Sequence, residues 1–116
     1  TGILASEVVS DQLRGFVFRE LGQFLLAGKS NPVLIRELIC RDGECGEADR
    51  RVCSSFALGL SAFRAQNWEE ALELFTATSR IVGRDNPSEF YIERCREHKA
   101  RPPEGPWSPV ISLKDK

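Results

Sequence analysis

The amino-acid sequence predicts an α+β fold, with an N-terminal helix and an antiparallel β-hairpin followed by three helices and a folded-back C-terminus. Apolar residues partly alternate over residues 16–27 and again occupy residues 33–39, which is typical of strands. After residue 50 the apolar period lengthens to about 3.6, which predicts helices. Residues 41–50 are polar and include Gly43 and Gly46, which indicates a linker. We therefore expect two parts, residues 1–40 and residues 51–116.

Composition excludes several classes of protein. The chain has 116 residues, of which 41% are hydrophobic and 28% charged, as in globular domains. The formal net charge of -1 provides no field to attract nucleic acid or an acidic membrane, so we expect no nucleic-acid partner. No apolar run approaches the roughly 20 residues that cross a bilayer, and no signal peptide is evident, so we expect no membrane insertion and a cytoplasmic location.

The cysteines do not predict a metal centre. Cys40, Cys45 and Cys53 follow no common zinc spacing, and His98 is the single histidine. Without a secretory signal we expect these thiols and Cys95 to be reduced.

The first part is predicted element by element. Residues 6–13 form a helix, since Ser6 can cap it and Glu7 suits its positive end. A strand over residues 16–27 is interrupted by Gly22, which indicates a bulge. Pro32 marks the start of a second strand, and the short Gly-containing connection before it predicts a hairpin.

The second part shows helical stripes and caps. One stripe places Val52, Phe56, Leu60 and Phe63 on a single helix face, and a second places Trp68, Ala71, Leu72 and Phe75 on another. Asn67 with Glu70 predicts a capping box. Gly83 ends that helix, and Asn86 with Pro87 predicts the cap and first residue of a third helix that runs to about His98. Its expected inner residues are Phe90, Tyr91 and Cys95.

The C-terminal segment holds four prolines, which forbid a helix, yet it is too apolar for a free tail. We expect it to fold back and to place Trp107 in a groove beside Leu60, Phe63 and Phe75, and we expect truncation of Trp107 to have little effect on the hairpin.

The helical half resembles a tetratricopeptide repeat. Aligning Ala71 and Phe75 with the small and aromatic positions of the second helix puts Leu58 and Gly59 on the Leu-Gly pair of the first. Ser55 replaces the usual aromatic residue, and Gly83 replaces the closing proline. The resemblance therefore implies one degenerate repeat, whose exposed faces the third helix and the tail must cover.

Two spaced sets of residues carry a second resemblance. The first set comprises Ser6-Glu7-Val8, Leu21-Gly22, Leu26, Gly28-Lys29, Pro32-Val33 and Leu38. The second set comprises Arg94-Cys95, Pro102-Pro103, Trp107, Val110, Leu113 and Lys114. With these two sets the whole chain resembles the C-terminal part of a bacterial class III adenylate or guanylate cyclase, the first set matching the end of the catalytic domain and the second its helical tail.

The resemblance implies one candidate substrate-binding residue, Lys29. In this family a Lys-Gly-Lys stretch closes the substrate site, and its first lysine contacts the nucleotide phosphates, a role that suits an ammonium group. Here Ala27 occupies that first position and Lys29 the second. A solvated hairpin turn is the alternative interpretation of Gly28-Lys29.

The remaining chemistry of the family lies upstream of the matched segment. The complete enzyme needs acids that hold two Mg²⁺ or Mn²⁺ ions, base-selecting residues and an Asn/Arg pair. Glu7, Asp11, Asp42, Glu44 and Glu47 are expected on solvated surfaces, so we expect no catalytic residue, metal ligand or cofactor in this chain.

Two hypotheses remain open. The chain is either the inactive C-terminal fragment of a cyclase that converts ATP, or GTP, to a cyclic 3′,5′-monophosphate, or a small helical module that binds a partner helix or peptide. In the first case its partners are the remainder of the cyclase, which is itself cytoplasmic or tethered to the inner face of a membrane, and a second copy paired through the strands.

Overall fold

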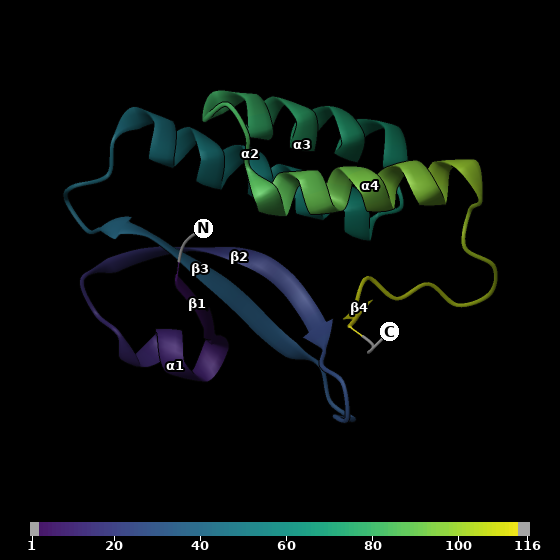
Figure 1. The fold of residues 1–116 in the computed structure, drawn as a ribbon, viewed down its shortest axis with the longest axis horizontal. Helices are drawn as coiled ribbons and strands as arrows, with labels where there is room; N and C mark the ends of the chain where they lie inside the picture. The colour runs from purple at the N-terminus through teal and green to yellow at the C-terminus, as the bar shows by residue number, and fades with distance from the viewer. Residues whose placement is uncertain (1–2, 114–116) are drawn as a thin grey trace. The chain divides into compact units, whose positions relative to one another are not determined.

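The computed structural model describes residues 3–113, and within them four helices and four strands follow the order β1-α1-β2-β3-α2-α3-α4-β4 (Figure 1). This arrangement confirms the α+β class. The chain divides into two compact units, one formed by the segment up to Cys45 together with the segment from Pro109, the other by Gly46–Ser108. Lys114, which matches the cyclase tail pattern, lies outside the described residues.

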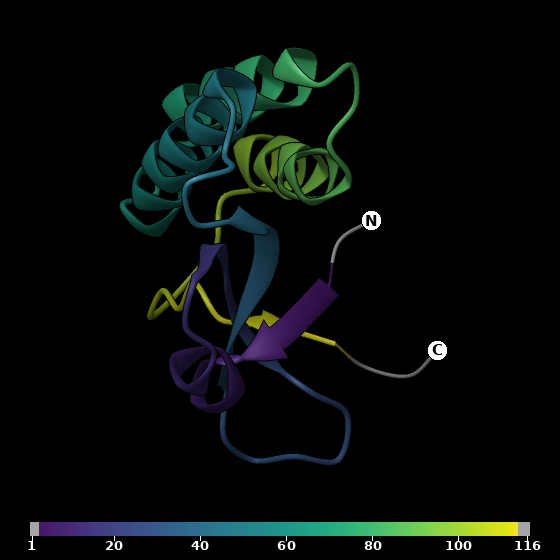
Figure 2. The same ribbon diagram turned by 90° about the vertical axis from the view of Figure 1, so that its left-hand side faces the viewer.

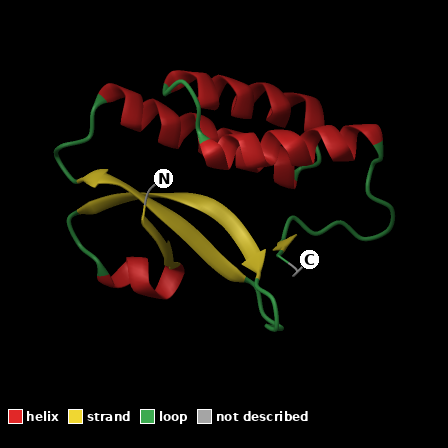
Figure 3. Ribbon diagram, in the orientation of Figure 1, coloured by secondary structure: helices red, strands yellow, loops and turns green. Residues whose placement is uncertain are grey.

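A four-stranded sheet forms the first unit. The strands β1 (Ile3–Ser6), β2 (Phe16–Leu25), β3 (Val33–Arg41) and β4 (Ile111–Ser112) lie in the order β1-β3-β2-β4 (Figure 3). The predicted hairpin is confirmed, because β2 and β3 pair in antiparallel fashion. The predicted bulge is confirmed too, since the register shifts between Glu20 and Gly22, and Gly22 has a φ of 126°.

Strand β1 is absent from the predicted fold and pairs with β3, which is therefore an inner strand. It leads directly into α1 (Glu7–Gln12), whose cap is Ser6 as predicted: the Ser6 hydroxyl accepts from Val9 N at 3.4 Å. Arg36 of β3 anchors this helix by donating to Ser10 Oγ at 3.0 Å and to Asp11 Oδ1 at 2.8 Å.

Three helices, α2 (Glu47–Arg64), α3 (Trp68–Ile81) and α4 (Asn86–Ala100), lie side by side in the second unit (Figures 1 and 2). The predicted stripe of α2 is confirmed, since its four members are buried: Val52, Phe56, Leu60 and Phe63. Gly59 permits close packing of α2 on α3, because a Cβ atom there would lie 2.8 Å from the Phe75 ring. Tyr91 and Cys95 of α4 are buried as predicted, and Phe90 is only partly buried.

Two predicted caps are wrong in detail. Asn67 precedes α3, but its side chain makes no capping hydrogen bond, so the expected capping box is not formed. The cap of α4 is Asp85 and not Asn86, because the Asp85 carboxylate accepts from Ser88 N at 3.3 Å. The Asp85 carboxylate also accepts from the Ser88 hydroxyl, and this second bond favours Asp85 as the cap.

The C-terminal segment folds back and Trp107 contacts Phe63, both as predicted, but its other ring contacts differ from those expected. Trp107 packs against Phe63 at 5.6 Å between ring centroids, and against Trp68 and His98 at 5.2 and 5.6 Å, near the end of α2 and not beside Phe75. Strand β4 is absent from the predicted fold, and it pairs in parallel with the end of β2. Strand β4 consists of the buried Ile111 and the exposed Ser112, so a two-residue segment extends the sheet.

Candidate functional site

The predicted substrate-binding residue Lys29 lies in the connection between β2 and β3, which projects beyond the strand ends (Figure 3). Lys29 N donates to Leu26 O at 3.0 Å, closing a turn in which Gly28 has a φ of 79°. That value favours glycine at the third turn position. Ala27 and Lys29 are both exposed. The ammonium group is therefore accessible to an anion.

An apolar groove of about 260 Å³ lies beside this turn on the sheet unit. Leu26 belongs to both features, because it lines the groove and accepts the turn hydrogen bond. The groove takes side chains from the strands and their connections: Leu4, Ala5, Ser6, Leu21, Phe24, Leu26, Ile35 and Leu113. Leu4 remains 59% exposed and Leu113 40% exposed, so this surface of the sheet is incompletely covered.

A buried ion pair joins β2 to β3. Arg19 and Glu37 are register partners, and Arg19 Nε and Nη2 donate to Glu37 Oε1 at 2.8 and 2.7 Å. Arg19 is 5% exposed and Glu37 8% exposed. The sequence signal for this pair is the opposite charge of two facing hairpin positions, although the pair was not among the predicted interactions. The pair fixes the register of the hairpin that carries Lys29.

The expectation of reduced thiols is wrong for Cys40 and Cys45, which form a disulfide with a Cα–Cα distance of 5.5 Å. The turn after β3 brings them together, a proximity that zinc-spacing rules do not detect. Cys53 and Cys95 take no part in a disulfide. Burial raises the pKa of the Cys95 thiol to about 11, so this thiol stays protonated and unreactive at neutral pH.

His98 belongs to an aromatic cluster in the helical unit. Its ring lies 4.6 Å from the Trp68 ring and 6.0 Å from the Phe63 ring, between centroids. Burial lowers the pKa of His98 below its ordinary value, with Glu97 raising it and Arg94 lowering it. The cluster is sealed by Trp107, whose Nε1 donates to Arg64 O at 2.8 Å. Because its rings pack closely, we assign this cluster a structural role.

The acids do not gather into a metal site. Over residues 3–113 there is no group of three or more His, Cys, Asp or Glu side chains able to hold a metal ion. Glu7, Asp11, Asp42, Glu44 and Glu47 are all exposed, and Asp11 is paired with Arg36. The described helices also include none long and apolar enough to cross a membrane.

Comparison with known proteins relates the chain to an adenylate cyclase. It is 33% identical over 94 residues to the terminal-differentiation specific adenylate cyclase of Dictyostelium discoideum. The match covers 77% of this chain but 4% of that protein. No family model matches the chain, and no solved structure matches it.

Proposed function

We propose that the chain is the C-terminal portion of a class III nucleotide cyclase, a bacterial one as the tail pattern implies, and that it forms the last strands of the catalytic domain followed by a helical tail. The complete enzyme would convert ATP, or GTP, to the cyclic 3′,5′-monophosphate in the cytoplasm. The similarity to an adenylate cyclase over 94 residues is the observation that carries this proposal.

The exposed apolar groove supports the same proposal. A groove lined by Leu4, Phe24 and Leu113 is costly to leave in water, at about 25 cal/mol per Å² of apolar surface. The remainder of the catalytic domain is the partner that would cover it. The sheet described above would then be one part of a larger sheet and would not act alone.

In the complete enzyme Lys29 would serve as a phosphate contact. Its ammonium group stands on an exposed turn whose shape is fixed by Gly28 and by the hydrogen bond to Leu26 O. A flexible point charge there can follow a polyphosphate as negative charge shifts during reaction. The metal ions supply the activation of the ribose hydroxyl, and because the described acids do not form a fitting ligand group, their ligands would come from the upstream polypeptide.

Activity measurements test this proposal. The purified chain, given ATP or GTP with Mg²⁺ or Mn²⁺, should form no cyclic nucleotide above background. The polypeptide encoded in frame upstream should carry the metal-binding acids and the Asn/Arg pair, and should lose activity when residues 1–116 are deleted. Turnover by the purified chain, or an upstream sequence without such acids, would refute the proposal.

Within the complete enzyme, Lys29→Ala should raise the KM for ATP about tenfold, the effect of losing one charge-assisted contact of roughly 1.4 kcal/mol. Ser30→Ala, in the same turn, is the matched control and should leave KM unchanged. An unchanged KM in Lys29→Ala would assign the turn a purely structural role.

A second candidate function is a helical module that binds a partner helix or peptide. It is favoured by Leu58 of α2, an apolar side chain that is 59% exposed in the middle of an amphipathic helix. Leu58→Lys should abolish such binding without unfolding the chain. Unchanged binding of a partner helix or peptide by the Leu58→Lys chain would show that Leu58 has no such role.

A further inference from the structure

The Cys40–Cys45 disulfide lies at one of the two points where the chain passes between the units. Cys40 is close to the end of β3, and Cys45 directly precedes Gly46, the cap of α2. The two half-cystines are five positions apart. The disulfide therefore closes residues 40–45 into a small ring, and these residues lead from β3 into the helical unit.

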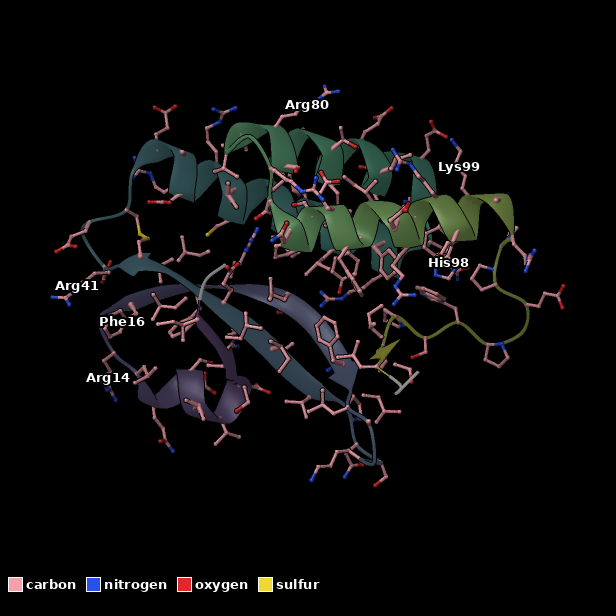
Figure 4. All side chains as sticks on the ribbon, in the orientation of Figure 1. Arg14, Phe16, Arg41, Arg80, His98 and Lys99 are labelled. Atoms are coloured by element: carbon pink, nitrogen blue, oxygen red, sulfur yellow. A yellow bond between two sulfur atoms is a disulfide. The ribbon has the colours of Figure 1, made fainter. Side chains whose placement is uncertain are left out.

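The ring is accessible to solvent. Cys40 and Cys45 are partly exposed, and the residues between them, Arg41 to Glu44, are all exposed. Arg41 points away from the sheet and its guanidinium lies 5.8 Å from the centroid of the Phe16 ring (Figure 4). Exposed disulfides are the ones that thiol reagents reach and reduce most readily.

Two backbone hydrogen bonds shape the turn that the disulfide closes. Glu44 N donates to Arg41 O at 2.8 Å, which closes a turn with Gly43 at a φ of 87°. Asp42 N donates to Gly15 O at 2.8 Å and fixes this turn to the start of β2. After reduction these two hydrogen bonds alone hold the turn, so the turn opens more often than in the disulfide form but still brings the thiols together for reoxidation.

Cleavage of so small a ring leaves the rest of the fold intact. The stabilisation that a disulfide provides grows with the length of the loop it closes, and this loop is short. The Cys95 thiol, by contrast, is fully buried in the helical core. Cys53 is a partly exposed free thiol, so within residues 3–113 the disulfide chemistry belongs to Cys40 and Cys45.

We propose that Cys40 and Cys45 form a thiol–disulfide exchange site that controls the conformational freedom of residues 41–46. A thiolate of the reductant attacks Cys45 Sγ, the Cys40–Cys45 bond breaks, and Cys40 leaves as a thiolate that takes a proton. A second thiol of the reductant then displaces Cys45. The net reaction turns one protein disulfide and two reductant thiols into two protein thiols and one reductant disulfide. This inference goes beyond the proposed cyclase function and does not depend on it.

Neighbouring charge selects the reductant. Asp42, Glu44 and Glu47 lie near the disulfide in sequence, with Arg41 as the one basic residue between the two cysteines, and all four are exposed. The carboxylates repel an attacking thiolate, and they repel glutathione more than 2-mercaptoethanol, because glutathione carries further negative charge. Reduction by glutathione should therefore accelerate more steeply with salt, which screens such repulsion, than reduction by 2-mercaptoethanol.

Labelling and proteolysis of the full chain test the proposal. Under denaturing conditions N-ethylmaleimide should add to at most two cysteines after equilibration with oxidised glutathione, which can also cap Cys53 as a mixed disulfide, and to four after dithiothreitol. Trypsin cleavage after Arg41 in the folded protein should rise about tenfold on reduction, because loop closure protects the linker. Cys40→Ser should be cleaved as fast as the reduced wild type, and Cys53→Ser should behave as the untreated wild type.

Two results would overturn the proposal. Four labelled cysteines after oxidation would mean that the disulfide does not form in solution. Equal cleavage of the oxidised and reduced wild-type chains would mean that the bond does not control the linker. This second comparison uses no variant, so misfolding of Cys40→Ser cannot obscure it.

Discussion

Truncation of Trp107 to alanine should destabilise the helical unit by about 3 kcal/mol. The indole is mostly buried, so of the 150–250 Å² that such a ring can bury at least about 100 Å² is removed from water, which is worth roughly 2.5 kcal/mol. Loss of the hydrogen bond from Nε1 to Arg64 O adds about 1 kcal/mol. The freedom regained by the C-terminal segment offsets part of this sum.

Urea unfolding followed by far-ultraviolet circular dichroism measures this change in the free energy of unfolding. Trp107→Phe is the matched control, because it retains an aromatic ring against Phe63 and Trp68 but removes the indole N–H. It should cost about 1 kcal/mol, the share of the hydrogen bond. A Trp107→Ala protein within about 0.5 kcal/mol of wild type would show that the ring contacts do not hold the segment, since such values are typical of surface substitutions.

Three further predictions concern packing, pH and association. Gly59→Ala should cost about 2–3 kcal/mol in urea unfolding, because its Cβ would lie 2.8 Å from the Phe75 ring. Gly105→Ala, with open space but a φ of 77°, should cost about 1 kcal/mol, and equal costs for the two variants would contradict the packing argument. The lowered pKa of His98 contributes stability above the unfolded pKa of 6.5, and this stability is lost as the pH falls toward the pKa of His98 in the folded chain. The urea midpoint should therefore drop between pH 7 and 5.5. If the urea midpoints of wild type and His98→Phe differ by the same amount at every pH, this prediction is refuted. We also propose that the isolated chain dimerises through β1, an edge strand whose Ile3 and Leu4 are 67% and 59% exposed. Sedimentation should detect a dimer, and Leu4→Lys should abolish it. An unchanged sedimentation coefficient in that variant would exclude β1 as the dimer interface.

The helical stripes and the β-hairpin could be predicted from the sequence because each depends on local spacing. Phe56 and Phe63 recur at helical intervals, and Pro32 and Gly22 mark positions that a regular strand disfavours. The disulfide and β4 could not be predicted in this way. Both depend on which distant or turn-adjacent residues the finished fold brings together, and two-residue β4 is too short to show a period.

In the candidate site, too, local features could be predicted from the sequence and features built from distant residues could not. Lys29 was singled out by motif, and the structure places it on an exposed turn. The groove beside that turn was not predicted, since its lining comes from residues as far apart in sequence as Leu4 and Leu113. The Arg19–Glu37 pair was within reach of the sequence, because facing positions of a hairpin with a known bulge can be counted.

The position of β4 makes the sheet depend on the helical unit. Ile111 reaches β2 only after the chain has passed through Gly46–Ser108, so a flexible insertion of about 60 residues would impose a loop-closure cost of roughly 3–4 kcal/mol. Two residues of parallel pairing contribute too little to offset such a cost. Folding of α2, α3 and α4 removes most of this loop-closure cost, because a folded insertion no longer samples the many end-to-end distances of a flexible chain. Trp107 is the side chain that holds the return segment on the folded helices. Hydrogen exchange at Leu113 N, which donates to Leu25 O at 2.8 Å, should therefore accelerate in Trp107→Ala, although the two residues belong to different units.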